Sequence, residues 1–140
     1  MRCVHVSVRR LVPLFIAAAV LAFSYRYFGS CVWAARDYSG LSLHGSVQVA
    51  SCNPWDKQVI VLQLDSAATR AAETEAMSHP NWRRMEEIDT AVTNRKSGAV
   101  ASLAGRHGVF LSNYDISHKG SDHLFVLDTD KQTLTVEHHD

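Results

Sequence analysis

The sequence has no excess of either charge, few cysteines and no short metal-binding motif. Fourteen basic and fourteen acidic residues cancel, so no broad basic face indicates a nucleic-acid partner. Neither HExxH nor C-x-x-C occurs, and the three prolines and seven glycines form no repeat or low-complexity segment. We therefore expect a small globular protein with no nucleic-acid partner and no cofactor.

Catalytic constellations are missing as well. Residues 40–45 (GLSLHG) approach the Gly-x-Ser-x-Gly pattern of a nucleophile elbow, but the second glycine comes one place late. No predicted strand precedes Ser42 to present its hydroxyl. Neither Cys31 nor Cys52 has neighbours that would lower a thiol pKa, so we expect no catalytic residue.

Acidic residues are absent before Asp37, and the chain opens with a basic segment and one apolar run. Arg9 and Arg10 precede residues 11–23 (LVPLFIAAAVLAF), which contain no polar side chain. This layout is typical of a secretory signal or a membrane anchor, whereas a core helix normally carries a polar stripe. We expect contact with a membrane through residues 11–28 and a folded part outside the cytoplasm.

Three fates of residues 1–35 are compatible with this pattern. Val32-Trp33-Ala34 is an acceptable small-residue cleavage site, and cleavage near Ala34 would release a secreted or periplasmic protein. Alternatively the span continues to Ala35, with Arg26 snorkelling to the interface, and anchors a domain that faces the periplasm or exterior. Lipidation at Cys31 is a third option, but Phe28 stands where an aliphatic residue is usual. We favour the uncleaved inner-membrane anchor.

The three cysteines allow one exported pair. Cys3 lies in the cytoplasmic or discarded start, which leaves Cys31 and Cys52 for a disulfide in an oxidising compartment. Cleavage after Ala34 would remove Cys31 and exclude that bridge. Two unpaired structural thiols are the alternative.

After the anchor, residues 36–46 form a polar connector and residues 47–140 form the folded domain. Strands are expected at 47–51, 58–64, 109–111, 123–127 and 133–138. Helices are expected at 67–77 with a cap at Asp65-Ser66, at 82–94, and at 97–104. This order predicts an α+β domain, an antiparallel sheet with two or three helices packed on one face.

The last two strands predict a hairpin with a definite register. If the chain turns about Asp130-Lys131, His123 lies opposite His138. Two cross-strand imidazoles with a carboxylate could hold zinc, but no motif supports this. We interpret both as surface or core-edge histidines and expect no metal site.

Residues 109–137 carry one resemblance to a known family. Tyr114-Asp115-Ile116-Ser117, followed by Leu124 to Asp128 (LFVLD), resembles the opening strands of murein L,D-transpeptidase (YkuD-like) catalytic domains. That resemblance implies peptidoglycan chemistry. The family's Ser-His-Gly-Cys catalytic segment does not occur in this sequence, however, and the aspartate and the aromatic residue are in reversed order.

Two functional hypotheses follow. The first is an exported or anchored cell-envelope protein with a non-catalytic binding domain, whose partner is peptidoglycan or an envelope enzyme, as for an inhibitor or immunity protein. The second is a truncated or degenerate L,D-transpeptidase-like enzyme.

Overall fold

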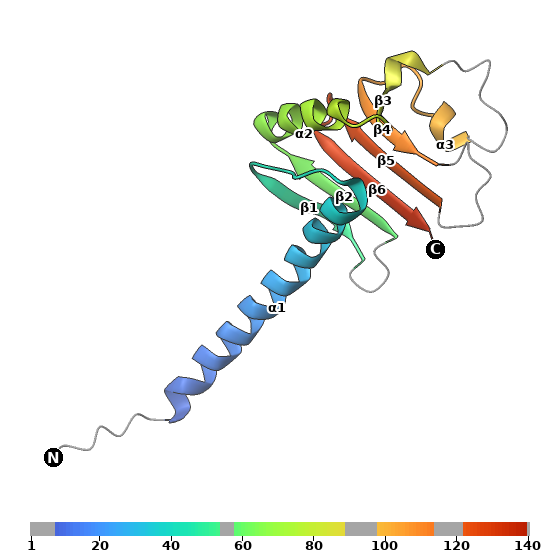
Figure 1. The fold of residues 1–140 in the computed structure, drawn as a ribbon. Coiled ribbons are helices and arrows are strands. Elements are labelled where there is room, and N and C mark those ends of the chain that lie inside the picture. The colour runs from blue at the N-terminus through green and yellow to red at the C-terminus, as the bar shows by residue number, and fades with distance from the viewer. Residues whose placement is uncertain (1–7, 54–57, 89–97, 114–121, 140) are drawn as a thin grey trace.

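The computed structural model describes residues 8–53, 58–88, 98–113 and 122–139 and has the predicted α+β architecture (Figure 1). The helices are α1 (Val8–Ser39), α2 (Ser66–Ser78) and α3 (Gly98–Ala101), with a 3₁₀ turn η1 (Met85–Glu87). The strands are β1 (Val47–Cys52), β2 (Val59–Leu64), β3 (Arg83–Arg84), β4 (Gly108–Ser112), β5 (Asp122–Asp128) and β6 (Thr133–His139).

All six strands belong to one antiparallel sheet with the order β1-β2-β6-β5-β4-β3. The β5–β6 hairpin pairs His123 with His138 and Leu127 with Leu134, which confirms the predicted register. The carboxylate of Asp128 stabilises its turn by accepting a hydrogen bond from the backbone N–H of Lys131 at 2.9 Å.

Helix α2 begins where the sequence predicts. The side chain of Asp65 accepts a 2.7 Å hydrogen bond from the backbone N–H of Ala68, which is a standard N-cap. Ala68, Ala72 and Ala76 are buried at intervals of four residues and so share one helix face. Their small side chains let α2 lie close to the sheet.

The sheet has an apolar cluster on each face. Strands β4 and β5 send alternate residues to the two clusters, because successive side chains of a strand point to opposite faces. The larger cluster joins the end of α1 and α2 to β2, β6 and one face of β4 and β5. The smaller contains Met85, Val100, Leu103, Phe110, Leu124 and Val126. The expectation that all helices lie on one face was therefore wrong, since η1 and α3 pack on the other.

The predicted helix at 82–94 was also wrong over its described part. Arg83 and Arg84 form β3 and pair with β4, and a 3₁₀ turn follows. The apolar spacing of Trp82 and Met85 suggested one helix face, but the two side chains enter different clusters on opposite faces of the sheet. Residues 89–94 lie outside the described part of the chain. Of the short helix expected at 97–104, only Gly98–Ala101 is helical among the described residues and forms α3.

The connector is shorter and less polar than predicted. Helix α1 continues to Ser39, so the connector begins at Gly40 rather than at residue 36. Leu41 and Leu43 are buried, whereas Ser42 between them is exposed. The connector therefore packs against the core through these two leucines and is not a solvated linker.

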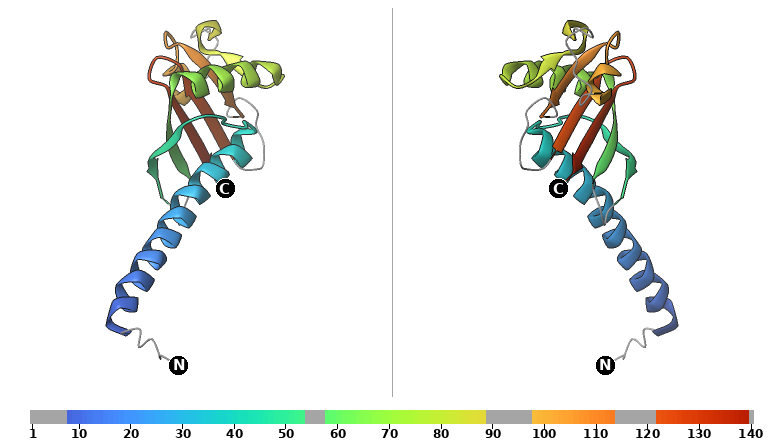
Figure 2. Two further views of the ribbon diagram at one scale, coloured as in Figure 1. Left: turned by 90° about the vertical axis from the view of Figure 1, so that its left-hand side faces the viewer. Right: turned by 90° about the vertical axis from the view of Figure 1, so that its right-hand side faces the viewer.

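Helix α1 has two halves with opposite surroundings. Its large apolar side chains from Val12 to Tyr25 are exposed, whereas Cys31, Ala34 and Ala35 are buried in the larger cluster. Figures 1 and 2 show the first half projecting away from the sheet as a single straight helix. The first half of α1 therefore projects from the domain, and its last turns complete the domain core.

A disulfide joins α1 to the sheet. Cys31 of α1 is bonded to Cys52 at the end of β1, with a sequence separation of 21 residues. The bridge fixes the point at which the exposed half of α1 meets the domain.

Replacing both Cys31 and Cys52 by serine should lower the free energy of unfolding by roughly 3 kcal/mol, the loop-closure entropy for a loop of this length. Urea denaturation followed by tryptophan fluorescence would measure the loss. The Cys3→Ser variant keeps the bridge, so it is the control and should unfold like the parent. An unchanged midpoint in the double variant would contradict a stabilising bridge.

A chain beginning at Ser30 should unfold cooperatively, whereas one beginning at Gly40 should not. The shorter chain lacks the buried side chains of Cys31, Ala34 and Ala35 and exposes the sheet face that they cover. Circular dichroism melting of the two purified chains would compare them. Equally sharp transitions would show that the end of α1 is dispensable.

Candidate functional site

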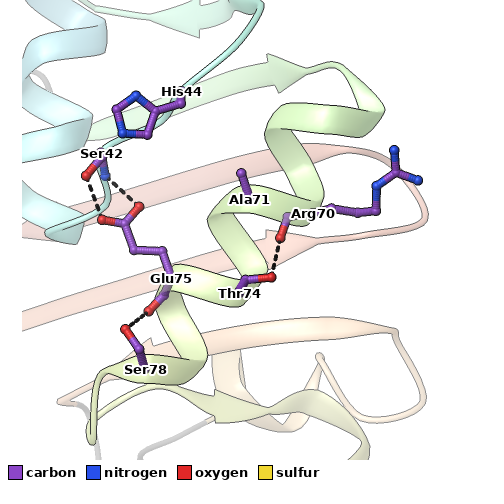
Figure 3. A pocket seen from close by; sticks show the side chains of 7 residues that line it. All are labelled: Ser42, His44, Arg70, Ala71, Thr74, Glu75 and Ser78. Carbon is purple, nitrogen blue, oxygen red and sulfur yellow. Dashed lines mark hydrogen bonds between the residues drawn. The ribbon is translucent and has the colours of Figure 1, made fainter.

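A shallow groove lies between the connector and the exposed face of α2 (Figure 3). Ser42 and His44 line it from the connector, and Arg70, Ala71, Thr74, Glu75 and Ser78 line it from α2. Glu75 accepts two hydrogen bonds from Ser42, one from its hydroxyl at 2.6 Å and one from its backbone N–H at 2.9 Å. This pair fastens the connector to α2.

The groove does not resemble a serine active site. A nucleophilic serine needs an oriented base and donors that stabilise the oxyanion. Ser42 instead donates directly to the carboxylate of Glu75 on an exposed surface. We therefore assign the Ser42–Glu75 pair a structural role.

His123 and His138, which were considered as metal ligands, lie opposite each other in the β5–β6 hairpin. His138 stacks on Tyr38 of α1 with ring centroids 4.7 Å apart, and His123 stacks on Phe125 at 5.0 Å. Among the described residues, no group of three or more histidine, cysteine or acidic side chains is placed to hold a metal ion. Both rings pack at the edge of the core.

Burial lowers the pKa of His123, and the neighbouring His138 lowers it further. Stacking on Phe125 is compatible with the neutral imidazole that this lowered pKa favours.

The start of β4 is tied to the β5–β6 turn by an ion pair. The guanidinium of Arg106 donates to the carboxylate of Asp128 at 2.6 and 3.1 Å, and Asp128 is buried. Burial raises the pKa of Asp128, but hydrogen bonds from Arg106 and Lys131, together with their charges, outweigh it and hold the pKa below the ordinary value. The pair is a structural clamp.

A second, exposed ion pair lies beside this clamp. Nδ1 of His107 is 2.8 Å from the carboxylate of Asp130, and that contact raises the pKa of His107. Both side chains are solvated, so the pair is screened. Its stabilisation is present below the ordinary histidine pKa and is lost as pH rises through the raised pKa.

Asp128→Asn should lower the free energy of unfolding by about 1–2 kcal/mol at neutral pH, because it removes a buried charge-assisted hydrogen bond. The folded pKa of Asp128 lies below its unfolded value, so the parent keeps this stabilisation above about pH 4 and loses it as pH falls through the folded pKa. Urea denaturation across the acid range should show a flatter pH dependence for the variant. Asp130→Asn, at the exposed pair, is the matched control and should have the smaller effect.

Neither the Ser42–Glu75 contact nor the Arg106–Asp128 clamp was foreseen from the sequence. Their members are 33 and 22 residues apart, and no local spacing connects them. The charged residues of a β-hairpin turn are ordinarily solvated, so nothing in the sequence indicated that the side chain of Asp128 would be buried.

The residues of the transpeptidase resemblance divide between described and undescribed parts. Leu124 to Asp128 lie in β5, where Asp128 serves the clamp described above. Tyr114 to Ser117 lie outside the described residues. The resemblance stays a prediction and brings no catalytic residue with it.

The exposed half of α1 is the feature most directly connected to a function. From Val12 onward the helix is long and apolar enough to be a membrane anchor or a signal sequence. Comparison with protein-family models, with curated proteins and with solved structures finds no match.

Proposed function

We propose that this chain is an uncleaved, membrane-anchored cell-envelope protein whose folded domain binds another envelope component without catalysis. One observation carries the proposal: helix α1 exposes an apolar surface along its first half and buries its last turns in the domain core. Because the end of this helix completes the core, we infer that α1 is kept in the mature protein and is not removed as a signal sequence.

Retention of the anchor is supported by what cleavage would remove. Ala34 and Ala35 are buried inside a continuous helix, and Cys31 is bonded to the sheet. Cleavage after Ala34 would take away the disulfide partner of Cys52 and a helical turn that covers β1 and β2. The free domain would then expose apolar surface.

The sequence on either side of the span supports an orientation. Arg9 and Arg10 favour a cytoplasmic N-terminus, which places the domain on the periplasmic or exterior side. A disulfide between Cys31 and Cys52 is compatible with that oxidising side.

A binding role fits the chemistry of the described residues. The ion pairs and the stacked histidines hold elements of the fold together, and the groove over α2 is shallow. Peptidoglycan, or an envelope enzyme that the domain inhibits or neutralises, is the kind of partner we propose. The degenerate L,D-transpeptidase-like enzyme remains the alternative on the resemblance of residues 109–137.

Crosslinking of the intact chain in its native membrane, followed by affinity recovery and mass spectrometry, tests this proposal. We expect the recovered chain to retain residues 1–35 and to carry one dominant envelope partner. A matched chain with residues 1–29 fused to an unrelated domain should recover the anchor's neighbours but not that partner.

Recovered chains that begin after Ala34 would contradict the anchor. Identical partners for the two chains would contradict a binding role for the domain. Cleavage or exchange of peptidoglycan peptide crosslinks by the purified chain, with a product absent from the buffer control, would favour the alternative.

A further inference from the structure

The direction of α1 relative to the sheet determines which strand faces the membrane. Cys31 is bonded to Cys52 of β1, and Tyr38 stacks on His138 of β6. Cys31 and Tyr38 are seven residues apart along α1, which is about 10 Å of helix. Strands β1 and β6 are two places apart in the sheet, also about 10 Å. Helix α1 therefore crosses the strands.

The first half of α1 then leaves the sheet past β1. Traced back from Cys31, the helix has no further strand to cover, because β1 is the edge of the sheet. Figure 1 shows the projecting half of α1 on the β1 side and β3 at the far side. Strand β1 is the part of the sheet nearest the membrane if α1 is the anchor.

The length of the span places that strand at the lipid surface. Arg9 and Arg10 mark the inner interface, and a hydrocarbon core of about 30 Å needs about 20 helical residues, from Leu11 to Ser30. Cys31 is the next residue, and it is already bonded to β1. The continuous helix leaves no linker that could hold the domain away from the headgroups.

The two edges of the sheet differ in a way that matches this placement. The far edge, β3, has two residues and both are arginines, a usual protection against pairing with another chain. The near edge, β1, has six residues (VQVASC) and no charge, and its pairing with β2 shifts register between Val49 and Ser51. An uncharged edge of this length presents outward-facing backbone N–H and C=O groups that need hydrogen-bond partners.

Resting on the proposed anchor, we propose that the folded domain stands on its β1 edge against the lipid headgroup layer, which is a second partner of the domain. Headgroups and their water supply hydrogen-bond partners for the outer side of β1. Trp33 on α1 is 64% exposed and Val59 at the start of β2 is 43% exposed, and both lie at the bridged end of the domain. An interfacial tryptophan at this level is typical of membrane proteins.

A second copy of the chain fits the edge less well. Antiparallel pairing of two β1 edges uses a two-fold axis normal to the sheet. Helix α1 packs on a face of the sheet, so its axis runs near the sheet plane and that rotation reverses it. The two anchors would then point to opposite sides and could not enter one membrane with the same orientation.

Quenching of a site-specific fluorophore by headgroup-labelled nitroxide lipid tests the placement. The full chain with Cys3→Ser carries the label at Gln48→Cys on β1 or at Ser78→Cys at the far end of α2, in phosphatidylethanolamine–phosphatidylglycerol vesicles. We expect quenching several-fold stronger at position 48 than at 78. Equal quenching of the two sites in an embedded chain would overturn the inference.

A helical insertion provides the geometric control. Inserting about seven polar residues after Gly29 would add about two helical turns, which should lift the domain by roughly 10 Å with little rotation. The quenching at position 48 should then disappear. The same insertion before Arg9 should leave the quenching intact. Persistent quenching after the first insertion would contradict a placement set by the anchor.

The remaining outcomes separate this inference from the proposed anchor. A chain that does not float with the vesicles overturns the anchor and the headgroup contact together. An embedded chain with an unquenched position 48 overturns the headgroup contact alone. Self-quenching between position-48 labels would overturn it in favour of paired β1 edges.

Discussion

Helix α1 meets two different surroundings along one unbroken length, and the rest of the structure depends on this continuity. Its first half presents apolar side chains outward, and its last turns are buried against the sheet. Burial in a protein core removes an apolar helix face from water, and the lipid insertion proposed for the first half would do the same. The Cys31–Cys52 bridge stands where the exposed half of α1 meets its buried end.

The domain itself is organised around a sheet that is covered differently on its two faces. The end of α1, the connector and α2 cover β2 and β6, whereas η1 and α3 cover β4 and β5 from the other side. Strand β5 contributes to both clusters, whereas the buried residues of β6 belong to the larger one. The turn between these two strands is held by the buried carboxylate of Asp128, so the polar contacts of this region maintain the fold.

This arrangement gives the molecule a near side and a far side with respect to α1. The near edge is a six-residue uncharged strand, and the far edge is two arginines. If α1 is the proposed anchor, the β1 edge stays at the tether and the far surfaces face away from it. The surfaces open to the proposed partner would then be those around α2, α3 and the β3 edge.

Much of this followed from the sequence alone, because the signals are local. The apolar run, the cap at Asp65, the alternation in the late strands and the hairpin register all depend on neighbours within a few residues. The spacing of Trp82 and Met85 led to the wrong prediction of a helix, because a paired edge strand can bury residues at that spacing as well as a helix can. Only tertiary structure decided that they enter opposite faces, that Ser42 meets Glu75 and Arg106 meets Asp128, and that α1 crosses the sheet. Those contacts join distant segments, and chain folding rather than local spacing brings them together.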